Sequence, residues 1–163
     1  MSIPAAHAST ARPNRLARSV AKLDRVPAAL RPWLRNKVMG RAVPFTGTAG
    51  LNFAHMAPER VEIAVANVRR VQNHIQGVHA AAMALLAETA TGMVVGMNVR
   101  DDCLPLAKTM RIDFKRRAQG AMRAVATLSD AQRQLMQQSD KGEVSVPVLV
   151  SDESGEQPIQ CEF

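Results

Sequence analysis

The stretch Gln72–Gly92 reads QNHIQGVHAAAMALLAETATG and is the longest run in the chain that has the composition of one buried helix. Ala, Leu and Met form its apolar body, while Asn73, His79 and Glu88 sit in or beside it. A carboxylate inside an apolar helix costs free energy unless another group pairs with it or a reaction uses it. These three polar side chains are therefore the first candidates for a functional site.

The composition predicts one domain with a hydrophobic core, because 47% of the 163 residues are hydrophobic. A net charge of +7 favours an anionic partner such as nucleic acid, a membrane surface or a phosphorylated small molecule. The four His and two Cys lack the spacing of metal ligands, so we expect no metal site. No apolar run approaches the ~20 residues that span a membrane.

The predicted location is the cytoplasm. Cys103 and Cys161 are too few and too far apart for a disulfide framework, which suits a reducing compartment. The first acidic residue is Asp24, and the preceding residues are rich in Ser, Ala and Arg, as in a mitochondrial presequence. The mitochondrial matrix is therefore the alternative location.

Residues 1–40 differ from the rest and are predicted to form a basic tail with short helices. Residues 1–13 have the Ala, Ser and Pro content of a poorly ordered segment. Asn14 is a predicted cap for a first helix that reaches Leu23, and a second helix is expected from Leu30 to Val38, ending at Gly40. The positive charges there fit a solvated helix face or an arm that binds nucleic acid.

Residues 41–163 are predicted to form a single α+β domain. A bent strand or loop is expected at 43–53, and a short helix at 130–138. Alternating or continuous apolar residues predict strands at 59–69, 93–99, 108–116, 121–128, 143–150 and 159–163. An antiparallel sheet wrapped around the one long helix is the natural packing of these elements.

The helix and the strand after it resemble the hotdog-fold thioesterase superfamily. In that family the central helix carries an Asn, a His six residues later that two glycines follow, and an Asp or Glu nine residues after the His. Asn73, His79 and Glu88 keep both spacings. Residues 109–120, TMRIDFKRRAQG, are similar to the family's next strand, and the resemblance covers roughly three quarters of the chain from about Val43 onward.

The resemblance implies a hotdog fold, a homodimer or a homotetramer built as a dimer of dimers, and hydrolysis of an acyl-CoA or acyl-carrier thioester. It implies no bound cofactor, because coenzyme A is part of the substrate. Glu88 is expected to act as base or nucleophile with Asn73 and His79, and the backbone at Ala80 and Ala81 to form the oxyanion site. The family usually has two glycines at those positions, so a non-catalytic module that binds acyl groups or a protein partner is the alternative.

The helical spacing independently predicts a dimeric site. At about 100° and 1.5 Å per residue, Glu88 lies half a turn away from His79 and ~13.5 Å farther along the axis. The two side chains therefore cannot serve one site from one helix. Two antiparallel copies related by a two-fold axis could bring one helix start to the middle of the other helix.

A basic cluster follows the helix, and its predicted role is to hold the phosphates of coenzyme A. This cluster consists of Arg111, Lys115, Arg116 and Arg117. Nucleic-acid binding is disfavoured because aromatic residues do not alternate with these charges and no recognised motif accompanies them. A solvated strand end remains the simpler alternative.

Overall fold

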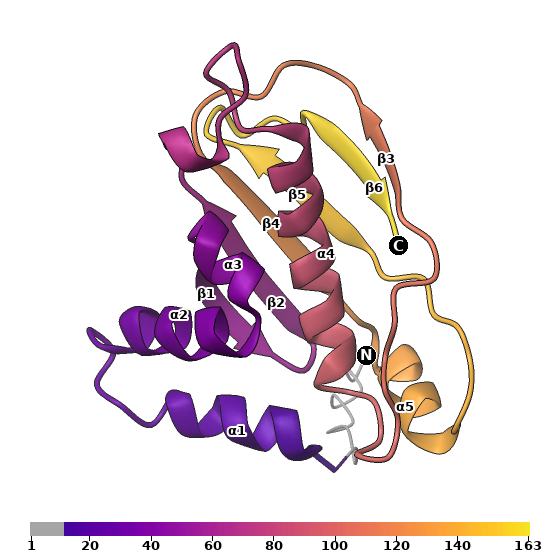
Figure 1. Ribbon diagram of the computed structural model, residues 1–163. Helices are drawn as coiled ribbons and strands as arrows, with labels where there is room; N and C mark the ends of the chain where they lie inside the picture. The colour runs from indigo at the N-terminus through magenta and orange to yellow at the C-terminus, as the bar shows by residue number, and fades with distance from the viewer. Residues whose placement is uncertain (1–11) are drawn as a thin grey trace, which may run out of the picture.

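The computed structural model describes residues 12–163 (Figure 1). Most of the predicted tail at residues 1–13 therefore lies outside the described residues. The elements in chain order are α1 (Arg15–Leu23), α2 (Arg31–Ala42), α3 (Pro44–Ala49), β1 (Asn52–Ala57), β2 (Arg60–Val65), the 3-10 turn η1 (Arg69–Val71), α4 (Ala80–Gly96), β3 (Arg111–Phe114), β4 (Met122–Thr127), α5 (Asp130–Gln138), β5 (Val148–Asp152) and β6 (Ile159–Glu162).

The strands form an antiparallel sheet that lies along one side of α4 (Figure 1). The order is β1-β2-β4-β5, and β6 pairs with β3 to form a second ribbon beside it. The hairpin after β5 returns the chain as β6, which contacts β5. The predicted α+β architecture, with one long central helix and N-terminal helices, is confirmed.

The core lies between α4 and the two central strands, β2 and β4. Leu86, Ala87 and Ala90 on the inner side of α4 are fully buried. Val61 and Ile63 of β2 are fully buried as well, because alternate residues of a strand point to the same face. The burial alternation of β2 and β4 follows the predicted hydrophobic pattern.

The long helix begins eight residues later than predicted. Residues 72–79 form a loop in which Asn73 starts a turn and Gln76 has a φ of 61°, a left-handed conformation that no helix contains. The backbone N–H of His79 then donates to Val71 O at 2.7 Å, which closes the loop just before the helix. The prediction was wrong here because polar turn residues can imitate the periodicity of a helix start.

The strand predicted at residues 93–99 is wrong, because residues 93–96 are the last turn of α4. Gly92 does not end the helix; it lies on the exposed side, and the cap is Met97. Apart from Asn98 the run is apolar because most of it is buried, and Leu16 of α1 packs at this end. A Cβ on Gly96 would lie 3.1 Å from Leu16 Cδ2, so a glycine lets the two helices approach closely.

Three smaller predictions need correction. Residues 44–49 form the helix α3 rather than a bent strand or loop, and Gly50 ends it with a φ of 71°. Helix α2 continues through Gly40 to Ala42. The strand expected at 143–150 is regular only from Val148, because Pro147 cannot donate a ladder hydrogen bond.

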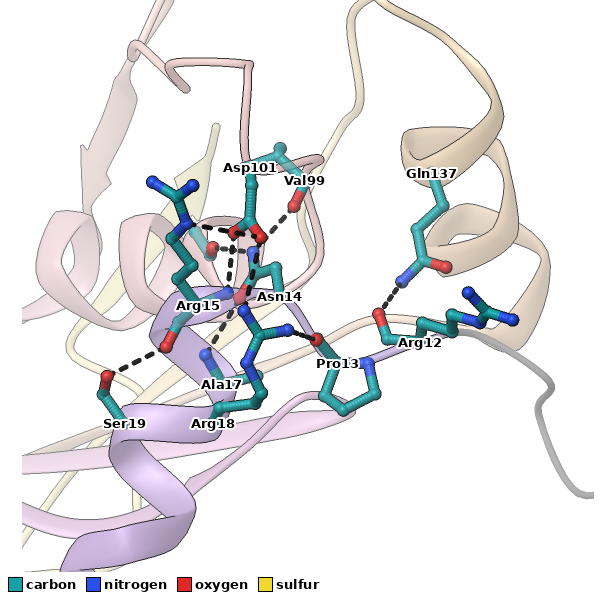
Figure 2. A network of polar contacts seen from close by, with 11 residues as sticks. Arg12, Pro13, Asn14, Arg15, Ala17, Arg18, Ser19, Val99, Asp101 and Gln137 are labelled. Atoms are coloured by element: carbon teal, nitrogen blue, oxygen red, sulfur yellow. Dashed lines mark hydrogen bonds and ion pairs between the residues drawn. The ribbon is translucent and has the colours of Figure 1, made fainter.

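Asn14 joins the first helix to the end of the central helix (Figure 2). Its Oδ1 accepts from Ala17 N at 2.9 Å and caps α1, as predicted. Its Nδ2 donates to Gly96 O at 2.8 Å and to Val99 O at 2.7 Å. A second buried amide, that of Asn98, donates to Val94 O at 2.7 Å and accepts from Arg133 Nε at 3.1 Å. The C-terminal end of α4 is therefore held by Asn14 before α1 and by Arg133 of α5.

No helix in the range 12–163 is both long and apolar enough to cross a membrane.

Candidate functional site

His79 caps the N-terminus of the central helix. Its backbone is extended, with φ −66° and ψ 144°, and its Nδ1 accepts a hydrogen bond from Ala81 N at 3.0 Å. The side chain is exposed. In this arrangement the imidazole satisfies one of the four N–H groups that every helix start leaves without a partner.

The backbone at Ala80 and Ala81 is the predicted oxyanion site. The N–H of Ala81 is occupied by the ring of His79. The N–H of Ala80 has no acceptor within the described chain, and both alanines are exposed. Because the helix dipole places partial positive charge here, the Ala80 N–H is an open donor for a developing negative charge.

Asn73 shapes the loop before the helix. Its Oδ1 accepts from Ile75 N and from Gly77 N, both at 3.1 Å, so the side chain closes a turn. The possible role of Asn73 as a helix cap is therefore excluded, because His79 is the cap. The structure places Asn73 and His79 in the same loop and shows no hydrogen bond between them.

Glu88 lies in the middle of α4 and is half-buried. Burial raises the pKa of its carboxyl group above the ordinary value of 4.5, and a contact with the Thr89 hydroxyl offsets part of this shift. Within residues 12–163 no basic side chain forms an ion pair with it, so the alternative pairing with Arg69 or Arg111 is not observed. A half-buried carboxylate without a cation holds its proton more tightly and is suited to accept one at neutral pH.

Glu88 belongs to the outer face of α4, which faces away from the sheet. This face is formed by the more exposed residues of the helix, Ala81, Ala84, Leu85, Glu88, Gly92 and Val95. Three of these six residues, Ala81, Ala84 and Gly92, are small. A Cβ on Gly92 would lie 3.6 Å from Glu88 Oε1, so the space beside the carboxylate is open.

One chain does not bring His79 and Glu88 together. His79 stands at the start of α4, and Glu88 follows nine helical residues later on the outer face. A straight helix separates these positions by ~13.5 Å along its axis and by half a turn around it. The predicted site is therefore incomplete within a single copy of the chain.

The predicted coenzyme A cluster divides into different environments. Arg116 donates to the buried carboxylate of Asp152 at 2.8 Å and to Ser154 Oγ at 2.8 Å. Although burial alone would raise the pKa of Asp152, hydrogen bonds from Ser154 and Gln119 and the charge of Arg116 hold it below its usual value. Arg116 therefore binds the β5–β6 hairpin through its side chain and is not a free cation for a phosphate group.

The other three basic residues are exposed. Arg111 and Lys115 lie 3.6 and 3.8 Å from the carboxylate of Asp113. Arg117 donates to Ile75 O at 2.8 Å and so reaches the loop in front of α4. Of the predicted cluster, Arg117 is the residue that the fold connects to the helix start.

A hollow of about 420 Å³ lies over β3 and β6, away from Glu88 and His79. Its lining is Arg111, Asp113, Gln160, Cys161 and Glu162. Two carboxylates make it a poor site for phosphate groups. Burial raises the pKa of the Cys161 thiol to about 11, so it is no nucleophile at neutral pH.

Asn67 is a site residue that the sequence analysis missed. Its Nδ2 donates to Gln76 O at 3.0 Å, and its Oδ1 is buried without a hydrogen-bond partner within the described chain. It therefore holds the loop before α4 from the end of β2. No sequence signal marks it, because an Asn after a strand is an ordinary loop residue.

The described residues contain no group of three or more His, Cys, Asp or Glu side chains placed to hold a metal ion.

Comparison with known proteins identifies the family. The model of the family described as "Domain of unknown function (DUF4442)" matches residues 31–163. No curated protein sequence matches the chain. The predicted division of the chain at residues 40 and 41 stays a prediction.

Solved structures share the fold across most of the chain. A Pseudomonas aeruginosa protein of unknown function, described as "Probable Thioesterase", is 23% identical with a TM-score of 0.72, over 84% of this chain and 92% of that chain. A variant of a thioesterase from Staphylococcus aureus is 15% identical with a TM-score of 0.60, over 74% and 94%. A thioesterase from Haemophilus influenzae is 12% identical with a TM-score of 0.59, over 72% and 78%.

At these identities the similarity shows the fold, and it confirms the resemblance to the hotdog-fold thioesterases at that level. The substrate and the site residues of this chain do not follow from it. By the match over residues 31–163, the chain belongs to the DUF4442 family, and its fold is the hotdog fold of the thioesterases.

Proposed function

We propose that this protein hydrolyses an acyl-CoA or acyl-carrier thioester at a site shared by two copies of the chain. The observation that carries the proposal is Glu88, a half-buried carboxylate without an ion-pair partner among the described residues, on the outer face of α4. Its desolvation costs free energy that the contact with Thr89 recovers only in part. A reaction that uses the carboxylate as a base accounts for it.

The proposed chemistry is base-assisted hydrolysis. Glu88 takes a proton from a water molecule while the water oxygen attacks the acyl carbon. The carbonyl oxygen becomes an oxyanion, which the Ala80 N–H stabilises at the positive end of α4. The carbon–sulfur bond then breaks, and the leaving thiolate takes the proton from Glu88, so that a carboxylic acid and a thiol are the products.

The second copy is needed because Glu88 lies more than two helical turns along α4 from the Ala80 N–H at the helix start. The small residues Ala81, Ala84 and Gly92 would allow an antiparallel α4 of another copy to approach closely. Glu88 of one protomer would then face the Ala80 N–H of its partner. Whether two such dimers combine into a tetramer depends on a further surface.

An apolar row beside β3 supports this assembly. Leu104 and Leu106 are 80% and 81% exposed, and Met110 and Phe114 continue the row into the strand. Among the described strands, β3 pairs with β6 alone, so its other edge has free backbone groups. An exposed strand edge with adjacent apolar side chains favours pairing with another chain.

Arg117 is the proposed contact for the phosphates of the coenzyme A substrate. It is exposed, and its link to Ile75 places it beside the loop that leads to His79. Arg111 and Lys115 would contribute more weakly, since both lie near Asp113. Arg116 would act through the hairpin that it holds. The proposed location remains the cytoplasm, with the mitochondrial matrix as the alternative.

The test is hydrolysis of a series of acyl-CoA chain lengths by the full chain and by Glu88→Gln. We expect the substitution to lower kcat by a factor of ~10²–10⁴, because it removes the base and keeps the shape. Glu59→Gln, an exposed glutamate outside α4, is the matched control and should keep full activity. Unchanged hydrolysis by Glu88→Gln would refute the assignment of the base.

The activity should also fall as the pH decreases through the pKa of Glu88, because a protonated carboxyl group cannot act as the base. Since burial raises the pKa of Glu88, the acidic limb of kcat/KM against pH should lie above the ordinary value of 4.5. Glu88→Gln should abolish this limb. An acidic limb at or below 4.5 would assign the titration to another group.

The second candidate function is binding without catalysis. The observation that favours it is the hydrogen bond from Ala81 N to His79 Nδ1, which leaves a single open N–H at the helix start. A site with one donor stabilises an oxyanion less than a site with two. If the wild-type chain binds an acyl-CoA tightly and does not hydrolyse it, binding without catalysis is the function.

A further inference from the structure

The helix α2 carries an apolar and basic surface on the outside of the molecule. Leu30, Trp33, Lys37 and Arg41 follow one another at helical spacings of three and four residues and therefore share one side. Trp33 is 61% exposed. Phe45 of the adjoining helix α3 is 60% exposed. We call these five residues the α2 surface.

The opposite side of α2 fixes the helix to the body of the protein. Met39 is buried, and the buried guanidinium of Arg35 donates to Ala54 O at 2.7 Å and pairs with Asp24 at 2.5 Å. Helix α3 packs closely on the side of the α2 surface itself, because Gly40 follows Lys37 by three residues and a Cβ on Gly40 would lie 3.1 Å from Gly47 Cα. Helix α2 lies at the outer margin of the molecule (Figure 1). Its exposed Trp33 is therefore carried by a helix that is fixed to the body of the protein.

The segment of sequence that contains the α2 surface carries charge of one sign. From Arg25 to Pro58 the sequence contains no Asp or Glu, while it contains five Arg and Lys. Within residues 12–163, Lys37 and Arg41 have no ion-pair partner, whereas Arg35 is neutralised by Asp24. A surface that combines unpaired positive charge with exposed Trp, Phe and Leu complements an anionic, apolar partner.

We propose that the α2 surface binds the face of an anionic lipid bilayer, with Trp33 and Phe45 entering the boundary between headgroups and acyl chains. Helices with basic residues beside Trp, Phe and Leu lie in this boundary, and each Lys or Arg near an anionic membrane adds attraction. Tryptophan suits the boundary because its ring is apolar and its N–H is polar. The chain would dock on the membrane as a peripheral protein.

Trp33 itself provides the measurement, because it is the only tryptophan and the chain has no tyrosine. We expect vesicles of phosphatidylcholine with phosphatidylserine to shift the emission of the full chain to shorter wavelength. Acyl-chain-brominated lipids in the same vesicles should quench it. Vesicles of phosphatidylcholine alone should have little effect, and salt should weaken binding, because exposed charges are screened.

Substitutions test which residues are responsible. Lys37→Gln/Arg41→Gln should weaken vesicle binding roughly 30-fold, because two cationic contacts are lost. Arg69→Gln/Lys141→Gln removes the same charge from other exposed positions and should bind as the wild type does. Leu30→Ala should weaken binding about tenfold. Leu135→Ala is its matched control, since the two leucines are 55% and 53% exposed.

Several results would overturn the proposal. One is the absence of any spectral shift with anionic vesicles. Equal loss of binding in the α2 variants and in their controls would show attraction by net charge without a defined surface. A shift without quenching by brominated lipids would show that Trp33 does not enter the bilayer. Concentration-dependent self-association that Trp33→Ala abolishes, without vesicle binding, would assign the surface to a second copy of the chain.

Discussion

The two ends of α4 use their backbone groups differently. At the C-terminal end, the Asn14 and Asn98 amides donate to backbone carbonyls, and both side chains are buried. At the N-terminal end, the cap is the exposed ring of His79, and the Ala80 N–H has no acceptor within the described chain. The first end is built for stability, whereas the second leaves a donor open at the positive pole of the helix.

The contrast predicts that substitutions at the C-terminal end of α4 lower the stability of the fold and leave the rate of hydrolysis unchanged. Asn14→Ala removes the cap of α1 and leaves the carbonyls of Gly96 and Val99 without their donor. We expect a loss of about 2–3 kcal/mol in the free energy of unfolding. Urea denaturation measures it, and Asn52→Ala, at an exposed position, is the control. A loss below about 0.5 kcal/mol would contradict the claim that the Asn14 contacts at the C-terminal end of α4 serve stability.

At the open end, His79→Ala should have a smaller effect on stability. Removal of an N-cap side chain costs about 1 kcal/mol. The same change releases the Ala81 N–H as a second donor, so hydrolysis should stay within a few-fold of the wild-type rate or rise. A loss of ~10² or more in kcat at unchanged stability would instead make the imidazole a catalytic group.

The smallest effect is expected for the stability of Glu88→Gln. A raised pKa in the folded state means that the ionised carboxylate destabilises the fold above that pKa, and that the cost disappears as the pH falls below the unfolded value. Gln has a similar shape and no charge. Its Tm should therefore be slightly higher than that of the wild type at neutral pH and equal to it in acid. A lower Tm at neutral pH would mean that the carboxylate makes a stabilising contact.

Local chemistry made part of the fold predictable. An Asn before an apolar helical pattern predicted the cap of α1, and the bounds predicted for α5 were confirmed, where Ser129 and Gln132 form a capping box. The alternation of Val61, Ile63 and Val65 predicted β2. These signals are local, so they do not depend on what the segment packs against.

Tertiary packing decided what the sequence analysis missed. The run at 93–99 is mostly apolar because Met93, Val94 and Met97 are buried at the end of α4, and no local pattern distinguishes this from a buried strand. The loop at 72–79 is fixed by Asn67 and by the hydrogen bond between His79 and Val71, which are distant or irregular contacts. The occupation of the Ala81 N–H by the ring of His79 was not predicted either, because it depends on a rotamer.

The Asn14 contact also imposes an order on folding during synthesis. Its two acceptors lie 82 and 85 residues later in the chain. At the ~5–20 residues per second of translation, several seconds pass between the emergence of α1 and that of its docking site. During this interval α1 can contact α2 and β1, which precede α4 in the chain, but it lacks the contacts that Asn14 makes with the end of α4. Helix α1 is thus fixed in its final place only when the central helix is complete.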